Sequence, residues 1–114
     1  MRALFESILS QPVIVPSIWI LEMCNVLVMS EKAGTLKIPL AKAVSALWNF
    51  PVAIDETIPE RAWAAVVKLA QRHGLSTYDA SYLELAQRKR ALLATLDDAL
   101  ARAAKAEGVL VLPN

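Results

Sequence analysis

The stretch Gly74–Leu100, GLSTYDASYLELAQRKRALLATLDDAL, carries two carboxylates whose spacing decides the fold that we expect. Asp79 falls in the first turn of a predicted helix over 76–90, and Asp97 follows a predicted buried strand over 91–96. A helix that leads into a parallel strand begins near the carboxyl end of that strand, so both acids are expected at one edge of a sheet. Open α/β sheets bind their ligands at that edge. The stretch therefore predicts an α/β domain with acidic side chains where its strands end.

The composition indicates one compact domain. The chain has 114 residues, and its hydrophobic share of 56% exceeds the roughly 45–50% of an average globular protein. Twelve basic and eleven acidic residues leave a net charge of +1, so any binding of nucleic acid needs a local patch. The single cysteine, Cys24, excludes an internal disulfide and a cysteine zinc site. The most apolar run, 18–29, is interrupted by Glu22 and Asn25 and is too short to span a membrane, and the first residues show no signal-peptide pattern. We expect a cytoplasmic protein.

Short apolar strands alternate with helices along the whole chain. We predict helices over 1–11, 18–33, 39–48, 59–73, 76–90 and 99–107, and strands over 13–15, 52–54, 91–96 and 109–112. The strands are apolar on both faces and are separated by helices, which is typical of a parallel sheet covered on both sides. The predicted fold is a single three-layer α/β/α domain over residues 1–114 with a mostly parallel sheet.

Glu22 is the acid with the most unusual surroundings. Its helix is apolar nearly all round, so we expect the helix to be buried, and an unpaired buried carboxylate costs several kcal/mol. Either an arginine or lysine from elsewhere neutralises Glu22, or Glu22 is a metal ligand or proton carrier, with Asn25 as its polar neighbour one turn on. Its place in the second turn after the strand over 13–15 favours the functional alternative.

The remaining acids also have structural explanations. Ser76 and Asp79 have the spacing of a capping box, and an acid in the first helical turn suits the helix dipole. Asp97 and Asp98 both suit the N-cap of the last helix; because one acid suffices there, we assign Asp98 to the cap and Asp97 to the site. Thr95 shares a strand face with Asp97, where its hydroxyl can orient a carboxylate or a water.

Converging carboxylates without histidine or cysteine suit a hard cation such as Mg²⁺ or Mn²⁺. Such an ion polarises a phosphoryl oxygen, generates hydroxide and holds a phosphate for in-line attack. No glycine-rich phosphate loop, Ser-His-Asp set or Cys/His set competes with this interpretation. The only histidine, His73, precedes Gly74 and is expected to end a helix, while Tyr78 and Tyr82 are expected to pack, and the tryptophans to lie in the core or at an interface.

Three motifs in this order resemble the PIN domain, and most closely the VapC-type toxins of bacterial toxin–antitoxin pairs. They are PSIWILEMCNVL (16–27), GLSTYDASYLELA (74–86) and LLATLDDAL (92–100), followed by a terminal GVLVLP. The resemblance implies a metal-dependent ribonuclease that hydrolyses phosphodiester bonds in single-stranded or looped RNA. It also implies a homodimer and neutralisation by a cognate antitoxin peptide.

The same resemblance implies roles for particular residues of this chain. The motif positions imply that Glu22, Asp79 and Asp97 are catalytic ligands of Mg²⁺ or Mn²⁺, that Asp98 is an auxiliary acid at the metal, and that Thr95 and Asn25 are supporting residues.

One part of the family pattern is missing. The family opens with a central strand that carries an aspartate, whereas this sequence begins within or just before the following helix. The absence removes one metal ligand and leaves a gap between the strands over 13–15 and 91–96. Truncation, a misassigned gene product, closure of the sheet and a strand borrowed from a second copy all remain open. With one carboxylate fewer, we expect weak or absent ribonuclease activity.

Partner surfaces are the least specified by the sequence. For RNA, the candidate cations are Arg88, Lys89 and Arg90, or Arg61, Lys68 and Arg72, although either set is also typical of a solvated helix face. The apolar helices over 18–29 and 39–48 are candidates for a groove that takes an antitoxin helix. The alternatives to a nuclease are a non-catalytic interaction module with the same fold and a fragment that does not fold alone.

Overall fold

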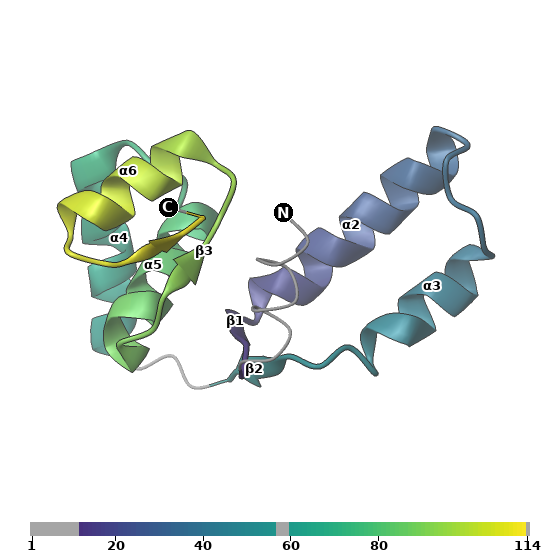
Figure 1. The fold of residues 1–114 in the computed structure, drawn as a ribbon, viewed down its shortest axis with the longest axis horizontal. Helices are drawn as coiled ribbons and strands as arrows, with labels where there is room; N and C mark the ends of the chain where they lie inside the picture. Colours follow the sequence, from purple (N-terminus) through teal and green to yellow (C-terminus); the bar gives the residue numbers. More distant parts are fainter. Residues whose placement is uncertain (1–11, 57–59, 114) are drawn as a thin grey trace. The chain divides into compact units, whose positions relative to one another are not determined.

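The computed structural model describes residues 12–56 and 60–113, which fall into two compact units, 1–55 and 56–114 (Figure 1). The described elements are β1 (Ile14–Pro16), α2 (Ile18–Lys32), α3 (Leu40–Leu47), β2 (Ala53–Asp55), α4 (Glu60–His73), α5 (Thr77–Lys89), β3 (Leu93–Ala94), α6 (Asp98–Ala106) and β4 (Val111–Leu112). The predicted helices from residue 18 onward are therefore present, with ends that differ by a single residue. The strands are shorter than expected or shifted by a residue, and the helix predicted over 1–11 lies outside the described residues.

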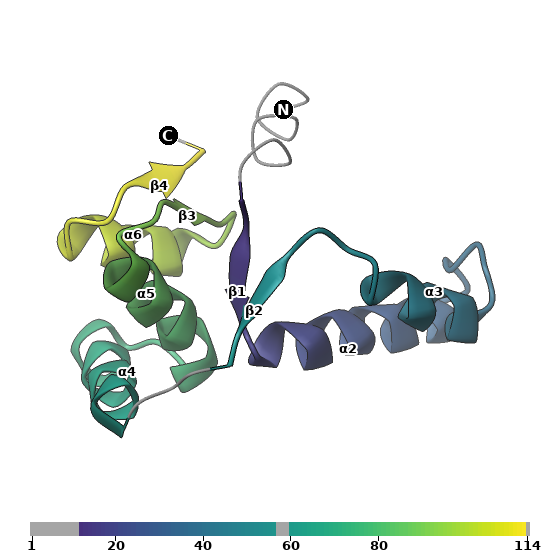
Figure 2. The ribbon, with the colours of Figure 1, turned by 90° about the horizontal axis from the view of Figure 1, so that it is seen from below.

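The first unit joins a parallel strand pair to a helical hairpin. β1 and β2 pair in the register Val15↔Ile54, and α2 and α3 lie side by side (Figure 2). α2 ends in a left-handed turn at Gly34, whose φ of 76° suits glycine, and the Thr35 amide closes the turn by donating to the Ser30 carbonyl at 2.9 Å. At the other end, Ser17 occupies the N-cap position, but its side chain forms no capping hydrogen bond.

The burial of α2 differs from the expectation. None of its residues is buried, although the helix is apolar nearly all round. α3 packs against one side of α2, and large side chains such as Leu21 and Met29 remain exposed. The apolar composition of α2 therefore did not predict how far the helix is buried. Among the described helices, including α2, each is too short or too polar to cross a bilayer.

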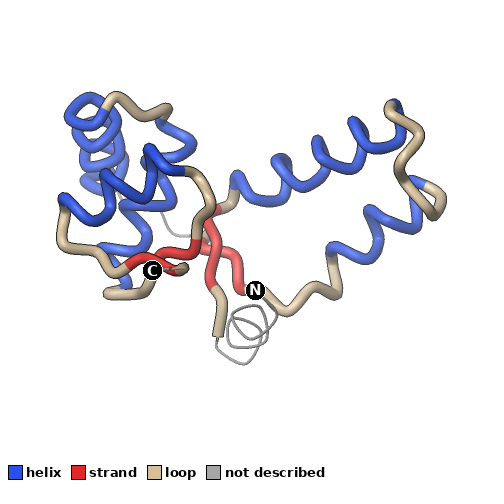
Figure 3. The backbone as a smooth tube through the Cα atoms, turned by 45° about the horizontal axis from the view of Figure 1, so that its top comes forward, coloured by secondary structure: helices blue, strands red, loops and turns tan. Residues whose placement is uncertain are grey.

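The second unit contains the main cluster of buried side chains. α4 and α5 pack against each other after a turn at Gly74, where φ is 65°, and α5 and α6 pack against the β3–β4 pair (Figure 3). Leu83 of α5 is fully buried at the centre of this cluster. The cluster consists of Leu69, Ala70, Ala80, Leu83, Ala86, Leu93, Leu100, Ala103, Ala104 and Val111. The amphipathic helices of this unit thus bury the faces that their apolar spacing predicts.

The strands form two separate parallel pairs. β1 pairs with β2 and β3 pairs with β4, and no hydrogen-bonded ladder between described strands connects the pairs. The α/β class with short parallel strands is confirmed, and it is consistent with a three-layer α/β/α arrangement.

Candidate functional site

Asp79 is presented by the start of α5. Ser76 is the N-cap residue, with extended backbone at φ −65° and ψ 158°, and its Oγ accepts a hydrogen bond from the Asp79 amide at 3.0 Å. The half-buried carboxylate of Asp79 forms no hydrogen bond or ion pair with any described residue. The serine therefore performs the capping, and only half of the predicted capping box is formed. The carboxylate stays available, in a position where the helix dipole favours its negative charge.

Asp97 has the role that the sequence assigned to its neighbour. α6 begins at Asp98, and Asp97 is the N-cap residue, whose Oδ2 accepts a hydrogen bond from the Leu100 amide at 2.8 Å. The assignment of Asp98 to the cap is wrong because the helix begins one residue earlier than expected. Capping engages one carboxylate oxygen of Asp97, so Oδ1 is left for another partner. Asp98 lies exposed in the first turn.

Thr95 fixes the main chain that leads to Asp97. Its amide donates to the Leu112 carbonyl at 3.0 Å, which ties it to β4, and its Oγ1 accepts a hydrogen bond from the Asp97 amide at 3.1 Å. The hydroxyl therefore acts on Asp97 through the main chain rather than through the carboxylate. Leu100, which Asp97 caps, and Ala80, which follows Asp79, belong to the same buried cluster. The buried core thus anchors the first turns of both helices.

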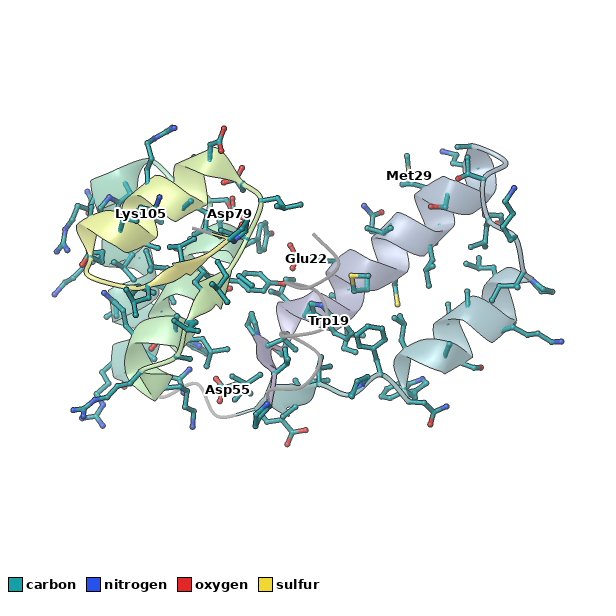
Figure 4. The ribbon with its side chains drawn as sticks, in the orientation of Figure 1. Trp19, Glu22, Met29, Asp55, Asp79 and Lys105 are labelled. Atoms are coloured by element: carbon teal, nitrogen blue, oxygen red, sulfur yellow. The ribbon has the colours of Figure 1, made fainter. Side chains whose placement is uncertain are left out.

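The third predicted ligand, Glu22, belongs to the other unit. It lies on α2 (Figure 4). Glu22 is half-buried and has an interaction partner, whereas Asn25 is exposed. Within residues 12–56 and 60–113, no group of three or more His, Cys, Asp or Glu side chains is arranged to hold a metal ion. The convergence of Glu22 with Asp79 and Asp97 therefore stays a prediction.

Asp55 is an acid that the sequence analysis missed. It is the last residue of β2 (Figure 4). Asp55 is only 7% exposed, and it pairs in register with Pro16 at the carboxyl end of β1. Like Glu22, it has an interaction partner. The signal was the acid that directly ends the apolar run Val52–Ile54, the same pattern that drew attention to Asp97. Asp55 therefore lies at the type of sheet edge where ligands bind.

Two of the predicted RNA-binding cations are engaged within their own unit. Arg72 Nη1 donates to Glu107 Oε2 at 2.7 Å, and Arg88 donates to both carboxylate oxygens of the buried Glu84, at 2.8 and 3.1 Å. Lys89 and Arg90 are exposed, but Arg90 is eleven residues beyond Asp79, about 16 Å along the helix. The basic end of α5 is therefore remote from the acidic end in the same unit.

Glu107 connects the ends of two helices. His73 is the last residue of α4, as expected, and its Nε2 lies 2.6 Å from Glu107 Oε2 at the end of α6. The hydrogen bonds from His73 and then Arg72 lower the pKa of Glu107 below its ordinary value. This cluster gives His73 a structural partner.

The aromatic side chains are more exposed than predicted. Tyr82 packs against the core, but Tyr78 is 61% exposed, so the expectation that it packs is wrong. Trp48 and Trp63 are also exposed, so neither lies in the described core, and the expectation that they lie at an interface stays a prediction. Trp19 contacts Phe50, with ring centroids 5.8 Å apart.

These features define an α/β domain of short parallel strands with acids at the starts of its helices. The sequence profile of the PIN domain matches residues 1–106, and the chain belongs to the PIN domain family. PIN domains are generally nucleases that need a divalent metal ion.

A solved structure supports the fold assignment. The chain is similar to the crystal structure of PAE2754 from Pyrobaculum aerophilum, with a TM-score of 0.64 and 24% sequence identity. The similarity covers 87% of this chain and 70% of that one. At this level of identity the likeness concerns the fold alone. No curated protein matches the chain in sequence.

Proposed function

We propose that this chain is a Mg²⁺- or Mn²⁺-dependent endoribonuclease of the VapC toxin type, with Glu22, Asp79 and Asp97 as metal ligands and Asp98 as an auxiliary acid. Membership of a family of metal-dependent nucleases supports the proposal. The single observation that carries it is the Asp79 carboxylate, which the Ser76 cap leaves without a hydrogen bond to any described residue.

The donor chemistry of these residues fits a hard cation. Carboxylate oxygens are the ligands that Mg²⁺ and Mn²⁺ prefer, and Mg²⁺ is usually held by one or two protein carboxylates together with waters. Asp79 offers both oxygens, and Asp97 offers Oδ1 while Oδ2 holds the helix start. When bound, the ion would polarise the scissile phosphate and lower the pKa of a bound water. Thr95 and Asn25 are proposed supporting residues, with Thr95 holding the main chain of Asp97.

The partners proposed for this chain follow from the toxin type. The substrate is RNA, the regulator is a cognate antitoxin, and the chain acts as a cytoplasmic homodimer. The exposed apolar side chains of α2, among them Leu21, Val26 and Met29, support the α2–α3 hairpin as the surface that takes an antitoxin helix.

A quenched-fluorophore RNA of single-stranded sequence, titrated with Mn²⁺ and Mg²⁺, tests the activity. Glu22→Gln and Asp79→Asn should each reduce cleavage by about 100-fold or more while the circular dichroism spectrum is retained. Glu31→Gln, on the exposed surface of α2, and Glu60→Gln, in the first turn of α4, are matched controls that should cleave like the parent. Equal cleavage by the parent and the Asp79→Asn variant would show that the site is misplaced.

The unburied face of α2 also supports a second candidate, a non-catalytic interaction module. Such a module shows no cleavage at any Mn²⁺ concentration but binds an amphipathic antitoxin-like peptide. Calorimetric titration with Mn²⁺ separates the candidates further, since loss of the Asp79 carboxylate lowers metal affinity only if that carboxylate is a ligand. A thermal melt without a cooperative transition would instead indicate a fragment that does not fold alone.

A further inference from the structure

Tyr78 is an exposed aromatic side chain in the first turn of α5. It is 61% exposed, and its side chain forms no hydrogen bond with any described residue. Tyr82, one turn further along the same helix, instead packs against the buried cluster. Exposed hydrophobic residues that occur singly are ordinary in proteins, so the neighbours of Tyr78 decide whether it has a role.

The residue that follows Tyr78 is the proposed metal ligand Asp79. Side chains of an α-helix tilt toward its N-terminus, so both side chains project over the start of α5. The main chain of this turn is held by two hydrogen bonds. The Asp79 amide donates to Ser76 Oγ at 3.0 Å, and the Ser81 hydroxyl donates to the Tyr78 carbonyl. Ala80, the next residue, is fully buried in the cluster, so the core anchors the turn that carries the ring and the carboxylate.

The charges along α5 limit how this turn can attract RNA. Asp79 is the only charged residue from Gly74 to Leu83, and the basic residues of α5 lie at the opposite end of the helix. The helix itself therefore offers no cation for an RNA phosphate near Asp79. Stacking of an aromatic ring on a nucleobase needs no cation, and every base has a face that can stack. The Tyr78 ring is the group of this turn that can make such a contact.

We propose that Tyr78 is a base-stacking residue, on which an unpaired base of RNA lies when the RNA is bound at Asp79. The inference rests on the proposed nuclease function, because RNA must be held at the Asp79 carboxylate for the base to reach the ring. Two properties of the substrate follow. The nucleotide beside Asp79 is unpaired, since a base inside a duplex is already stacked on both faces. Purines are favoured over pyrimidines there, since their larger rings stack more strongly.

Fluorescence anisotropy with labelled oligoadenylate and oligouridylate of equal length tests the stacking. Ca²⁺ replaces Mg²⁺ in this assay because it also binds carboxylate oxygens, and gel electrophoresis verifies that the RNA stays intact. The parent should bind oligoadenylate several-fold more tightly than oligouridylate. Tyr78→Ala should weaken the binding of oligoadenylate by about tenfold and remove this preference. The loss should be the same at low and high salt, because stacking releases no counterions.

Three variants distinguish the aromatic ring from the other properties of the side chain. Tyr78→Phe keeps the ring and should bind like the parent, whereas Tyr78→Leu keeps an apolar side chain without a ring and should bind like Tyr78→Ala. Trp63→Ala removes an aromatic side chain of similar exposure, 60%, from α4 and is the matched control that should bind like the parent. All variants should keep the parental circular dichroism spectrum, since both positions are exposed.

Binding of oligoadenylate by Tyr78→Ala at the parental affinity overturns the proposal. Binding by Tyr78→Phe that is as weak as that of Tyr78→Ala also overturns it, because the hydroxyl would then be the group that matters. A loss that fades as the salt concentration rises overturns it as well. The fluorogenic RNA tests the nuclease separately. Weaker binding by Tyr78→Ala without cleavage by the parent refutes the nuclease alone, and cleavage by the parent with unchanged binding by Tyr78→Ala refutes the stacking alone.

Discussion

Two single substitutions at the start of α5, Ser76→Ala and Asp79→Asn, distinguish a structural role of Asp79 from a catalytic one. In Ser76→Ala, the Asp79 amide loses the hydroxyl that accepts its hydrogen bond at 3.0 Å. Loss of an N-cap of this kind lowers the free energy of unfolding by about 1 kcal/mol, within a range of roughly 0.5–2. In Asp79→Asn, no hydrogen bond to a described residue is lost, so only the interaction with the helix dipole disappears, about 0.3–1 kcal/mol.

The effects on activity should have the opposite order. Asp79→Asn removes a proposed metal ligand and should abolish cleavage, whereas Ser76→Ala leaves the carboxylate in place and should keep at least part of the parental rate. Urea unfolding followed by circular dichroism at 222 nm measures the stability, and the fluorogenic RNA measures the activity. If Asp79→Asn costs clearly more stability than Ser76→Ala and the two variants lose activity equally, Asp79 is a capping residue and the reasoning is refuted.

Three further outcomes follow from contacts in the second unit. Asp97→Ala should lower the free energy of unfolding by about 1 kcal/mol because the Leu100 amide loses the carboxylate that caps it. Asp98→Ala should lower it by only a few tenths of a kcal/mol. If urea titrations give the opposite order, Asp98 and not Asp97 is the capping residue. Leu83→Ala, at a fully buried position, should cost about 2–5 kcal/mol in the same titration, and a cost below about 1 kcal/mol would contradict the assigned core. The folded-state pKa of Glu107 is lowered from 4.5, so its contribution to stability is present above about pH 4.5 and is lost as the pH falls through the folded-state value. Glu107→Gln should flatten that part of the acid unfolding curve, and a curve identical to that of the parent would exclude the contribution.

The helices were predictable because their signals are local. Apolar residues at helical spacing specify them, together with a terminal glycine or serine or, for α3, the preceding Pro39, and Gly34, Gly74 and Ser76 lie where those signals place them. The strands were less predictable in length, since a strand needs a partner and β3 keeps only two residues of the apolar run 91–96. The prediction that α2 is buried was wrong for a related reason. The apolar character of a helix favours its burial but does not identify the surface against which it packs.

The side-chain contacts show the same difference between local signals, which the sequence contains, and contacts that depend on the fold. The Arg88–Glu84 pair was predictable from its spacing of four residues on one helix. The Arg72–Glu107 pair joins residues 35 apart and depends on the ends of α4 and α6 meeting in the fold, which no local pattern contains. Asp97 and Asp98 are adjacent, so which of them caps the last helix depends on a shift of one residue in the position where the helix begins. A shift of that size is within the ordinary uncertainty of predicted helix ends.

The division of the strands into two pairs has a consequence for main-chain dynamics. In most parallel sheets a central strand is hydrogen-bonded on both edges, and its amides exchange with solvent only when the whole domain unfolds. Here each described strand has one paired edge, so strand amides should exchange through small local openings. The slowest hydrogen exchange should be in the middle of α5, around the fully buried Leu83, which makes a helix the most persistent part of this α/β protein.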